Sequence, residues 1–177
     1  MIFTPTRLDG VFVVELQPFV DERGSFARTY CEREFAAQGL ALLSAQSNQS
    51  YNRHAGTLRG LHYQTPPHDE AKLVRCARGR LWDVAVDLRP NSVSRGQWFG
   101  VELTESNNRQ LYIPAGCAHG FQTLCDDTEV FYQMSNFYAP DAATGVRYDD
   151  PAFGIEWPLP VAQISPKDRQ WPDFRPA

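Results

Sequence analysis

The segment Thr57–Gln64 combines the apolar residues of a strand with side chains that could handle protons and charges. His62 can act as an acid or a base near neutral pH, and Gln64 lies on the same strand face, two residues further on. A lone histidine in a strand is most often a surface or packing residue, but here Arg59 places a guanidinium nearby. Strict alternation puts Arg59 and His62 on opposite faces. Both therefore reach one cavity only if Gly60 introduces a bulge or a kink.

A second histidine, His119, follows a Pro-x-Gly turn at residues 114–116. This pattern resembles the second motif of cupin barrels, whose metal-binding members bring three histidines and a glutamate to one metal. Here Gln64 stands where the second histidine of the first motif would be, and no glutamate follows at the right distance before Lys72. Two imidazoles rarely hold a catalytic metal alone. We therefore expect a jelly-roll barrel without a metal site.

Most of the chain shows the period of two that is typical of β-strands. The segment Arg80–Arg89 alternates well, with Trp82, Val84, Val86 and Leu88 on one face. Turn residues separate it from its neighbours. Further strands are predicted at Gly10–Leu16, Ser25–Tyr30, Ser44–Tyr51, Thr57–Gln64, Lys72–Ala77, Gln97–Leu103, Gln110–Ile113, Gly120–Leu124 and Glu129–Phe137.

Two segments depart from this period. Glu32–Gln38 predicts a short helix that Gly39 ends, and the proline-rich stretch from Tyr138 onwards predicts irregular chain with room for one helical turn. Many short strands with little helix indicate an all-β fold. We expect a cupin-like jelly-roll barrel or sandwich of antiparallel strands, with short peripheral helices and an irregular C-terminal segment.

Length and charge limit the function classes. A chain of 177 residues suits one domain, and no composition shift divides residues 1–177. The 17 basic and 21 acidic residues give a net charge of −4, which argues against nucleic acid or an anionic membrane as the partner. No apolar run approaches the ~18 residues that a membrane span needs. Polar residues interrupt the first ten positions, which argues against a signal peptide.

The four cysteines form no CxxC pair. Cys31, Cys76, Cys117 and Cys125 lie far apart in the sequence, and all but Cys31 have apolar neighbours. This spacing favours reduced thiols over disulfides or a zinc site, and we expect a cytoplasmic protein.

Nine short motifs occur in order along nearly the whole chain. They are Asp21–Phe26, Gly56–Gln64, Lys72–Arg75, Gly79–Arg89, Ile113–Phe121, Tyr138–Pro140, Asp149–Pro151, Ile155–Pro158 and Ser165–Asp168. Any one of them would be a weak signal, but nine in register make a chance match negligible. With these motifs the chain resembles the dTDP-4-dehydrorhamnose 3,5-epimerase family of dTDP-sugar isomerases.

The resemblance implies a cofactor-free epimerase that acts on a nucleotide-linked 4-keto-6-deoxyhexose. The C3 and C5 protons flank the C4 carbonyl, so removal of either gives an enolate, and the ketone itself is the electron sink. By resemblance His62 is the base, and Asp168 is the carboxylate that orients it and stabilises its imidazolium form. Lys72 matches the family lysine near the C4 oxygen. Tyr132 matches the tyrosine that returns a proton on the other face.

A separate group of residues should hold the sugar and its nucleotide. By resemblance these are Arg23, Phe26, Arg28, Gln46, Asn48, Arg59, His119, Tyr138 and Lys167. Arg59 and Lys167 suit the diphosphate because they are charged donors.

The resemblance also implies a homodimer. Family members are dimers in which N-terminal strands cross to the neighbour and complete its nucleotide site. The N-terminal strands carry Phe3, Phe12, Val14 and Phe26, more apolar surface than a small sheet edge would leave exposed. We expect Phe26 and Arg28 near the partner's cavity.

Two positions depart from the family pattern. Arg28 stands where the family usually has a glutamate, and Ala143 where it usually has an acidic residue. These changes leave the catalytic candidates intact, but they do not decide which nucleotide the substrate carries. GDP- and CDP-linked sugars are alternatives. Inversion at C3, at C5 or at both also stays open. Two other hypotheses are an isomerase that moves the keto group between C4 and C3, and a nucleotide-sugar-binding cupin without activity. The presence of all four catalytic candidates argues against the latter.

Overall fold

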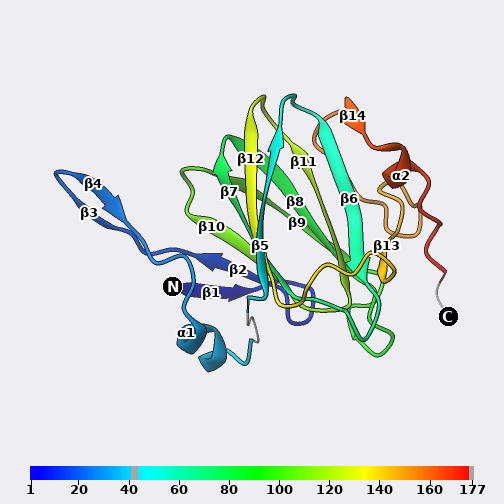
Figure 1. Ribbon diagram of the computed structural model, residues 1–177, viewed down its shortest axis with the longest axis horizontal. Helices are drawn as coiled ribbons and strands as arrows, with labels where there is room; N and C mark the ends of the chain where they lie inside the picture. Colours follow the sequence, from blue (N-terminus) through cyan, green and yellow to red (C-terminus); the bar gives the residue numbers. More distant parts are fainter. Residues whose placement is uncertain (41–43, 176–177) are drawn as a thin grey trace.

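Two antiparallel sheets face each other in the computed structural model, which describes residues 1–40 and 44–175 (Figure 1). The first sheet has the order β1 (Ile2–Pro5), β2 (Phe12–Glu15), β10 (Arg109–Ile113), β7 (Lys72–Arg78), β12 (Thr128–Met134) and β5 (Gln46–Asn52). The second has the order β13 (Ala143–Gly145), β6 (Thr57–Gln64), β11 (Cys117–Thr123), β8 (Arg80–Asp87) and β9 (Trp98–Thr104), and β14 (Gln163–Ile164) pairs with β6. This is the predicted jelly-roll arrangement.

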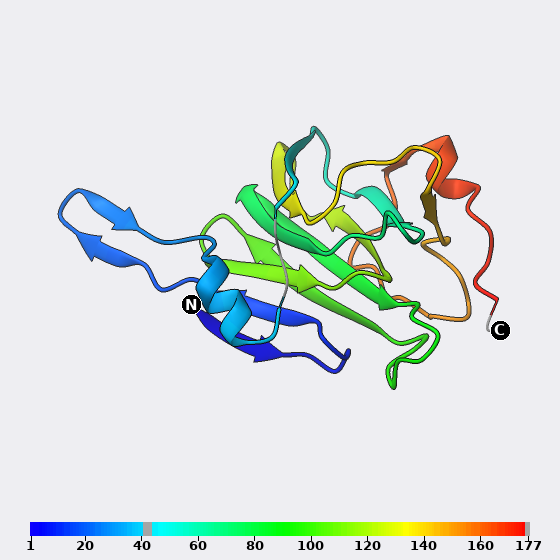
Figure 2. The ribbon, with the colours of Figure 1, turned by 60° about the horizontal axis from the view of Figure 1, so that its bottom comes forward.

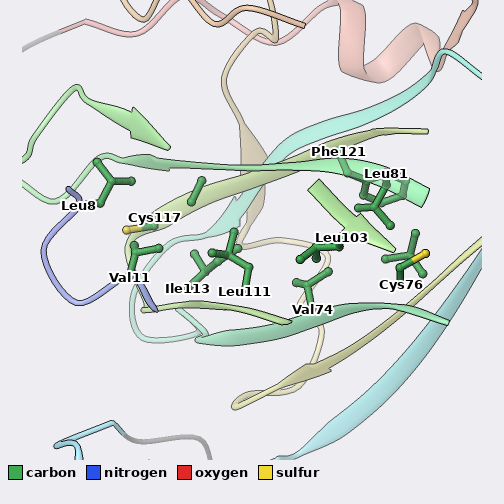
Figure 3. Close-up of a cluster of buried hydrophobic side chains, with 12 residues drawn as sticks. Leu8, Val11, Val74, Cys76, Leu81, Leu103, Leu111, Ile113, Cys117 and Phe121 are labelled. Carbon is green, nitrogen blue, oxygen red and sulfur yellow. The ribbon is translucent and has the colours of Figure 1, made fainter. Parts of the chain in front are cut away.

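The alternation in β8 explains the layers of the molecule. Ala85 points into the cluster between the two sheets, whereas its neighbours Val84 and Val86 point to the opposite face. The cluster between the sheets, shown in Figure 3, draws on β7 to β12 and includes Leu81, Leu103, Leu111 and Phe121. Because both faces of the second sheet carry apolar side chains, this sheet needs a cover on its outer side.

The C-terminal segment supplies that cover. Phe153, Ile155, Trp157 and Phe174 pack against the outer face of the second sheet. Figure 2 shows the segment running along this side of the molecule, through α2 (Pro166–Arg169) and on beyond it. The predicted helical turn is therefore present, but the expectation of wholly irregular chain is wrong at β13 and β14, which pair with β6.

Helix α1 (Glu32–Ala37) covers the outer face of the first sheet. Phe35 is buried there, and Phe3, Phe12 and Val14 pack in the same cluster. Gly39, which follows the C-cap residue Gln38, adopts a φ of +73° and ends the helix as predicted. Val14 is buried in this cluster and Phe3 and Phe12 are partly buried, so α1 covers part of the apolar surface that we expected a partner chain to cover. No helix in the described ranges is long and apolar enough to cross a membrane.

A two-stranded hairpin, β3 (Phe19–Asp21) and β4 (Gly24–Phe26), projects away from both sheets (Figures 1 and 2). It carries Phe19, Val20 and Phe26, which are 79%, 77% and 72% exposed. The predicted strand Ser25–Tyr30 is shorter than expected, since β4 ends at Phe26, where its pairing with β3 ends.

The four cysteines are free thiols, as predicted, and all of them lie in the described part of the chain. Burial raises the pKa of Cys76 and of Cys117 to about 12. These two thiols are therefore unreactive packing residues near neutral pH.

Candidate active site

A cleft of about 1090 Å³ lies between the two sheets and is bordered by α2. One wall comes from β5, β7 and β12, and the other from β6, β11, β13 and β14. Most of the predicted site residues line it: Arg59, His62, Lys72, His119, Tyr132, Tyr138, Lys167 and Asp168. The fold thus gathers residues from distant parts of the chain at one place.

His62 and Asp168 form a hydrogen-bonded pair at the cleft. The imidazole Nε2 lies 2.6 Å from Asp168 Oδ1, with the histidine side chain 44% exposed and the aspartate side chain 7% exposed. The backbone N–H of Gly60 and the indole N–H of Trp171 also donate to this carboxylate. Burial raises the pKa of Asp168, but the bonds from His62, Gly60 and Trp171 outweigh it, so the pKa lies below its usual value. Asp168 is therefore ionised and orients an imidazole that faces the cleft.

The predicted irregularity at Gly60 lets Arg59 and His62 share this cleft. In the β6–β11 ladder His62 pairs with His119 and Arg59 pairs with Phe121, so β6 has one extra residue in this interval. Gly60 adopts a φ of +134°, and a Cβ there would lie 2.5 Å from the Cα of Gly120. Only glycine fits so close to the neighbouring strand. Arg59 is then fixed by Asn52, whose Oδ1 accepts from Nε at 2.8 Å.

Lys72 forms a buried ion pair that the sequence did not predict. Its Nζ lies 3.0 Å from Glu70 Oε1 and donates to the backbone oxygen of His62 at 3.1 Å. The two side chains are 8% and 3% exposed. Glu70 supplies the counter-charge that stabilises an ammonium group at this depth. In the sequence, the position of Glu70 two residues before Lys72 was the only signal of this ion pair.

Tyr132 approaches the cleft from the sheet opposite His62. It lies on β12, where it pairs with Asn48 of β5 and Val74 of β7. Burial raises the pKa of its phenol, the charge of Arg59 lowers it, and the charge of Glu70 raises it, with a net increase. The phenol is therefore protonated near neutral pH and can donate a proton from the wall opposite His62.

A second histidine–carboxylate pair lies deeper in the cleft. His119 Nε2 is 2.7 Å from Oδ1 of Asp83, which is fully buried. Asp83 was not predicted as a site residue, because it faces His119 only through the pairing of β8 with β11. The bond fixes the imidazole of His119 while its ring lines the cleft.

Gln46 and Asn48 support the cleft without lining it. Gln46 Oε1 accepts from the backbone N–H of Tyr138 at 2.8 Å, and its Nε2 donates to Asn48 Oδ1 at 3.3 Å. Both amide groups approach the sulfur of Met134, a lining residue.

A match to the family model described as dTDP-4-dehydrorhamnose 3,5-epimerase spans residues 5–176. The chain belongs to this family. The family's enzyme from Methanothermobacter thermautotrophicus is 44% identical over 98% of this chain and 94% of its own length. A crystal structure of the enzyme from Elizabethkingia anophelis superimposes with a TM-score of 0.95 at 41% identity and covers 98% of this chain and 96% of that one. A crystal structure of the Legionella pneumophila enzyme in complex with dTDP-4-keto-L-rhamnose superimposes with a TM-score of 0.91 at 36% identity. It covers 97% of this chain and 92% of that one.

Three residues that resemblance to the family placed in the substrate site lie outside the cleft of this single chain. Arg23 is on the projecting hairpin and pairs with Asp21, Phe26 is exposed at the end of β4, and Arg28 pairs with Glu34 beside α1. Like Gln46 and Asn48, they do not line the cleft. Their role in substrate binding stays a prediction.

The described residues contain no group of three or more histidine, cysteine or acidic side chains that could hold a metal ion. His62 and His119 are each bonded to a carboxylate instead, at 2.6 and 2.7 Å. The expectation of metal-independent chemistry stays a prediction.

Proposed function

We propose that this protein is an epimerase that inverts one or both carbon centres beside the ketone of a dTDP-linked 4-keto-6-deoxyhexose. The observation that carries the proposal is the placement of proton-transfer groups on opposite walls of one cleft. His62 with Asp168 occupies one wall and Tyr132 the other. Inversion of a carbon centre needs removal of a proton from one face and delivery of a proton to the opposite face.

The first step transfers a proton from C3 or C5 to the imidazole of His62. The electron pair of the broken C–H bond moves into the ring to form an enolate, and its negative charge settles on the C4 oxygen. Lys72 has two of its three N–H groups committed to Glu70 and to the His62 carbonyl, so one remains for that oxygen. A preorganised charged donor that stabilises such an oxyanion contributes strongly to catalysis.

The second step returns a proton to the same carbon from the phenol of Tyr132. The enolate electrons re-form the C–H bond on the opposite face, and the C4 ketone is restored. Asp168 stabilises the imidazolium that exists between the two steps. His62 then releases its proton to water and the Tyr132 phenolate takes one up, which restores both groups for the next turnover.

A diphosphate would bind at the α2 end of the cleft. Arg59 and Lys167 both line the cleft, Lys167 from α2 and Arg59 from the position before Gly60, whose N–H donates to Asp168 of α2. Charged donors suit diphosphate oxygens. The Legionella relative was solved with a dTDP-linked sugar, and this supports dTDP over the GDP and CDP alternatives. Ala143 lines the cleft where an acidic residue was expected, so one contact of the usual pattern is replaced.

The active form would be a homodimer that exchanges its N-terminal hairpins. Three large apolar side chains on a two-stranded hairpin are more than a single chain would leave in water. Docking of the hairpin against a second copy would bury them and carry Arg23, Phe26 and Arg28 to the partner's cleft. The shared core supports one domain over residues 1–177, and four free thiols suit the cytoplasm.

Incubation with dTDP-4-keto-6-deoxyglucose in deuterated water tests the function directly. Deuterium should enter C3, C5 or both, and epimerised product should form, with the positions labelled giving the regiochemistry. A protein that binds the nucleotide sugar without exchange would instead be a binding module. Movement of the ketone to C3 would identify the keto-isomerase alternative.

A further inference from the structure

Trp171, two residues beyond α2, contacts both the His62–Asp168 pair and Lys167, a residue expected to bind the diphosphate. Its indole Nε1–H donates to Asp168 Oδ1 at 3.3 Å, the same oxygen that His62 Nε2 approaches to 2.6 Å. Its ring meets the His62 ring edge to face, with centroids 6.2 Å apart. The ammonium of Lys167 lies 5.1 Å from the centre of the indole. One side chain therefore contacts three of the residues assigned to chemistry and binding.

The fold leaves a specific place for this indole. A Cβ at Gly145 would lie 2.7 Å from the indole Cε2 and Nε1 atoms. Gly145 is the partner of His62 in the ladder between β13 and β6. The strand beside the base thus lacks a side chain at the position that the indole occupies, so Trp171 is fixed against the sheet that carries His62.

We propose that Trp171 is a positioning residue that holds both the His62–Asp168 pair and the ammonium of Lys167 in their working geometry. The inference rests on the proposed function and deepens it, because it links the proton-transfer site to the diphosphate end of the cleft through one side chain. The indole N–H fixes the rotation of the Asp168 carboxylate, and the indole face holds the lysine through a cation–π contact. The lowered pKa of Asp168, to which the bond from Trp171 contributes, agrees with this arrangement.

Substitutions can separate the effect of the indole N–H from that of its aromatic face. Trp171→Phe keeps an aromatic face for Lys167 and removes the N–H, so kcat should fall about tenfold while KM changes less than about twofold. Trp171→Leu removes both, so KM for the nucleotide sugar should rise several-fold as well. If Trp171 had only a structural role, both substitutions would lower the melting temperature, but they would not affect kcat and KM differently.

Trp157→Phe is the matched control. It removes another indole N–H from the same C-terminal segment, one that donates to the backbone oxygen of Tyr148 at 2.9 Å and does not line the cleft. Its kcat and KM should stay close to those of the unmodified protein. In a His62→Ala background, Trp171→Phe should cause no further loss, because the N–H acts through Asp168 on His62.

A readout independent of turnover separates this inference from the proposed function. In protein with ¹⁵N-labelled histidine, Trp171→Phe should shift the imidazole Nε2 resonance of His62, and Trp157→Phe should leave it unchanged. An inactive unmodified protein would refute the proposed function while the spectra still decided the role of Trp171. Equal spectra and equal kcat for the Trp171→Phe and Trp157→Phe proteins would overturn the inference.

Discussion

Replacement of Asp168 by asparagine isolates the contribution of the carboxylate charge to catalysis. The side chain is nearly isosteric and is 7% exposed, so its packing is largely kept. What is lost is a charge-assisted hydrogen bond with an N–O distance of 2.6 Å to the base. Hydrogen bonds to charged groups contribute about 1.5–3 kcal/mol. Since each 1.36 kcal/mol corresponds to a factor of ten, kcat should fall roughly ten- to a hundredfold.

His62→Ala removes the proposed base and should lower kcat further, by about 10²–10⁴, with nucleotide binding nearly unchanged. The double variant should be little slower than His62→Ala, because the two residues act as one unit. Turnover is followed by deuterium entry and product formation. Asp149→Asn is the control, since its carboxylate pairs with Arg147 outside the cleft. Near-normal turnover of His62→Ala would refute the assignment of the base.

Further outcomes follow from the same geometry. Tyr132→Phe should still exchange a substrate proton with deuterated water but form no epimer, and NMR of the recovered sugar checks this. A chelator should leave activity unchanged, and loss that a divalent ion restores would revive a metal role for His62 and His119. Asp87 has a folded-state pKa of about 2 against 3.8 unfolded, since bonds from neighbouring donors outweigh its burial. Asp87→Asn should therefore reduce unfolding free energy by about 2 kcal/mol at neutral pH. In urea unfolding, the difference in unfolding free energy between the unmodified protein and Asp87→Asn should be present above pH 4 and should disappear as the pH falls towards 2. Phe26→Ser should weaken a dimer measured by sedimentation, and full activity of a monomer would contradict the dimer.

The strands of the barrel could be predicted because their periodicity is a local property. The bounds of β6 match the predicted Thr57–Gln64, and β8 begins at Arg80 as expected. β13 and β14 have two or three residues each and exist only because β6 offers them partners. Such short elements carry no period of their own, so tertiary pairing alone creates them.

The support of the catalytic groups was much harder to predict than the groups themselves. His62 stands out as a polar residue in an apolar strand, but Asp168 was assigned to it only by resemblance, across 106 positions. Asp83 and Trp171 were missed for the same reason. Asp83 contacts His119 through the pairing of β8 with β11, and Trp171 contacts His62 through the docking of the C-terminal segment; neither leaves a mark in the local sequence.

The C-terminal segment ties the stability of the outer layer to the chemistry in the cleft. Its aromatic residues cover the second sheet, and β14 then pairs in parallel with Thr57 and Leu58 of β6. This pairing sets the register of the chain just before Ser165, whose hydroxyl accepts from the backbone N–H of Asp168 and begins α2. The carboxylate thus reaches His62 from a segment whose register is set against β6, the strand that carries His62. Loss of the outer layer would remove Asp168, Lys167 and Trp171 together, so a barrel with an intact core would still lack a working site.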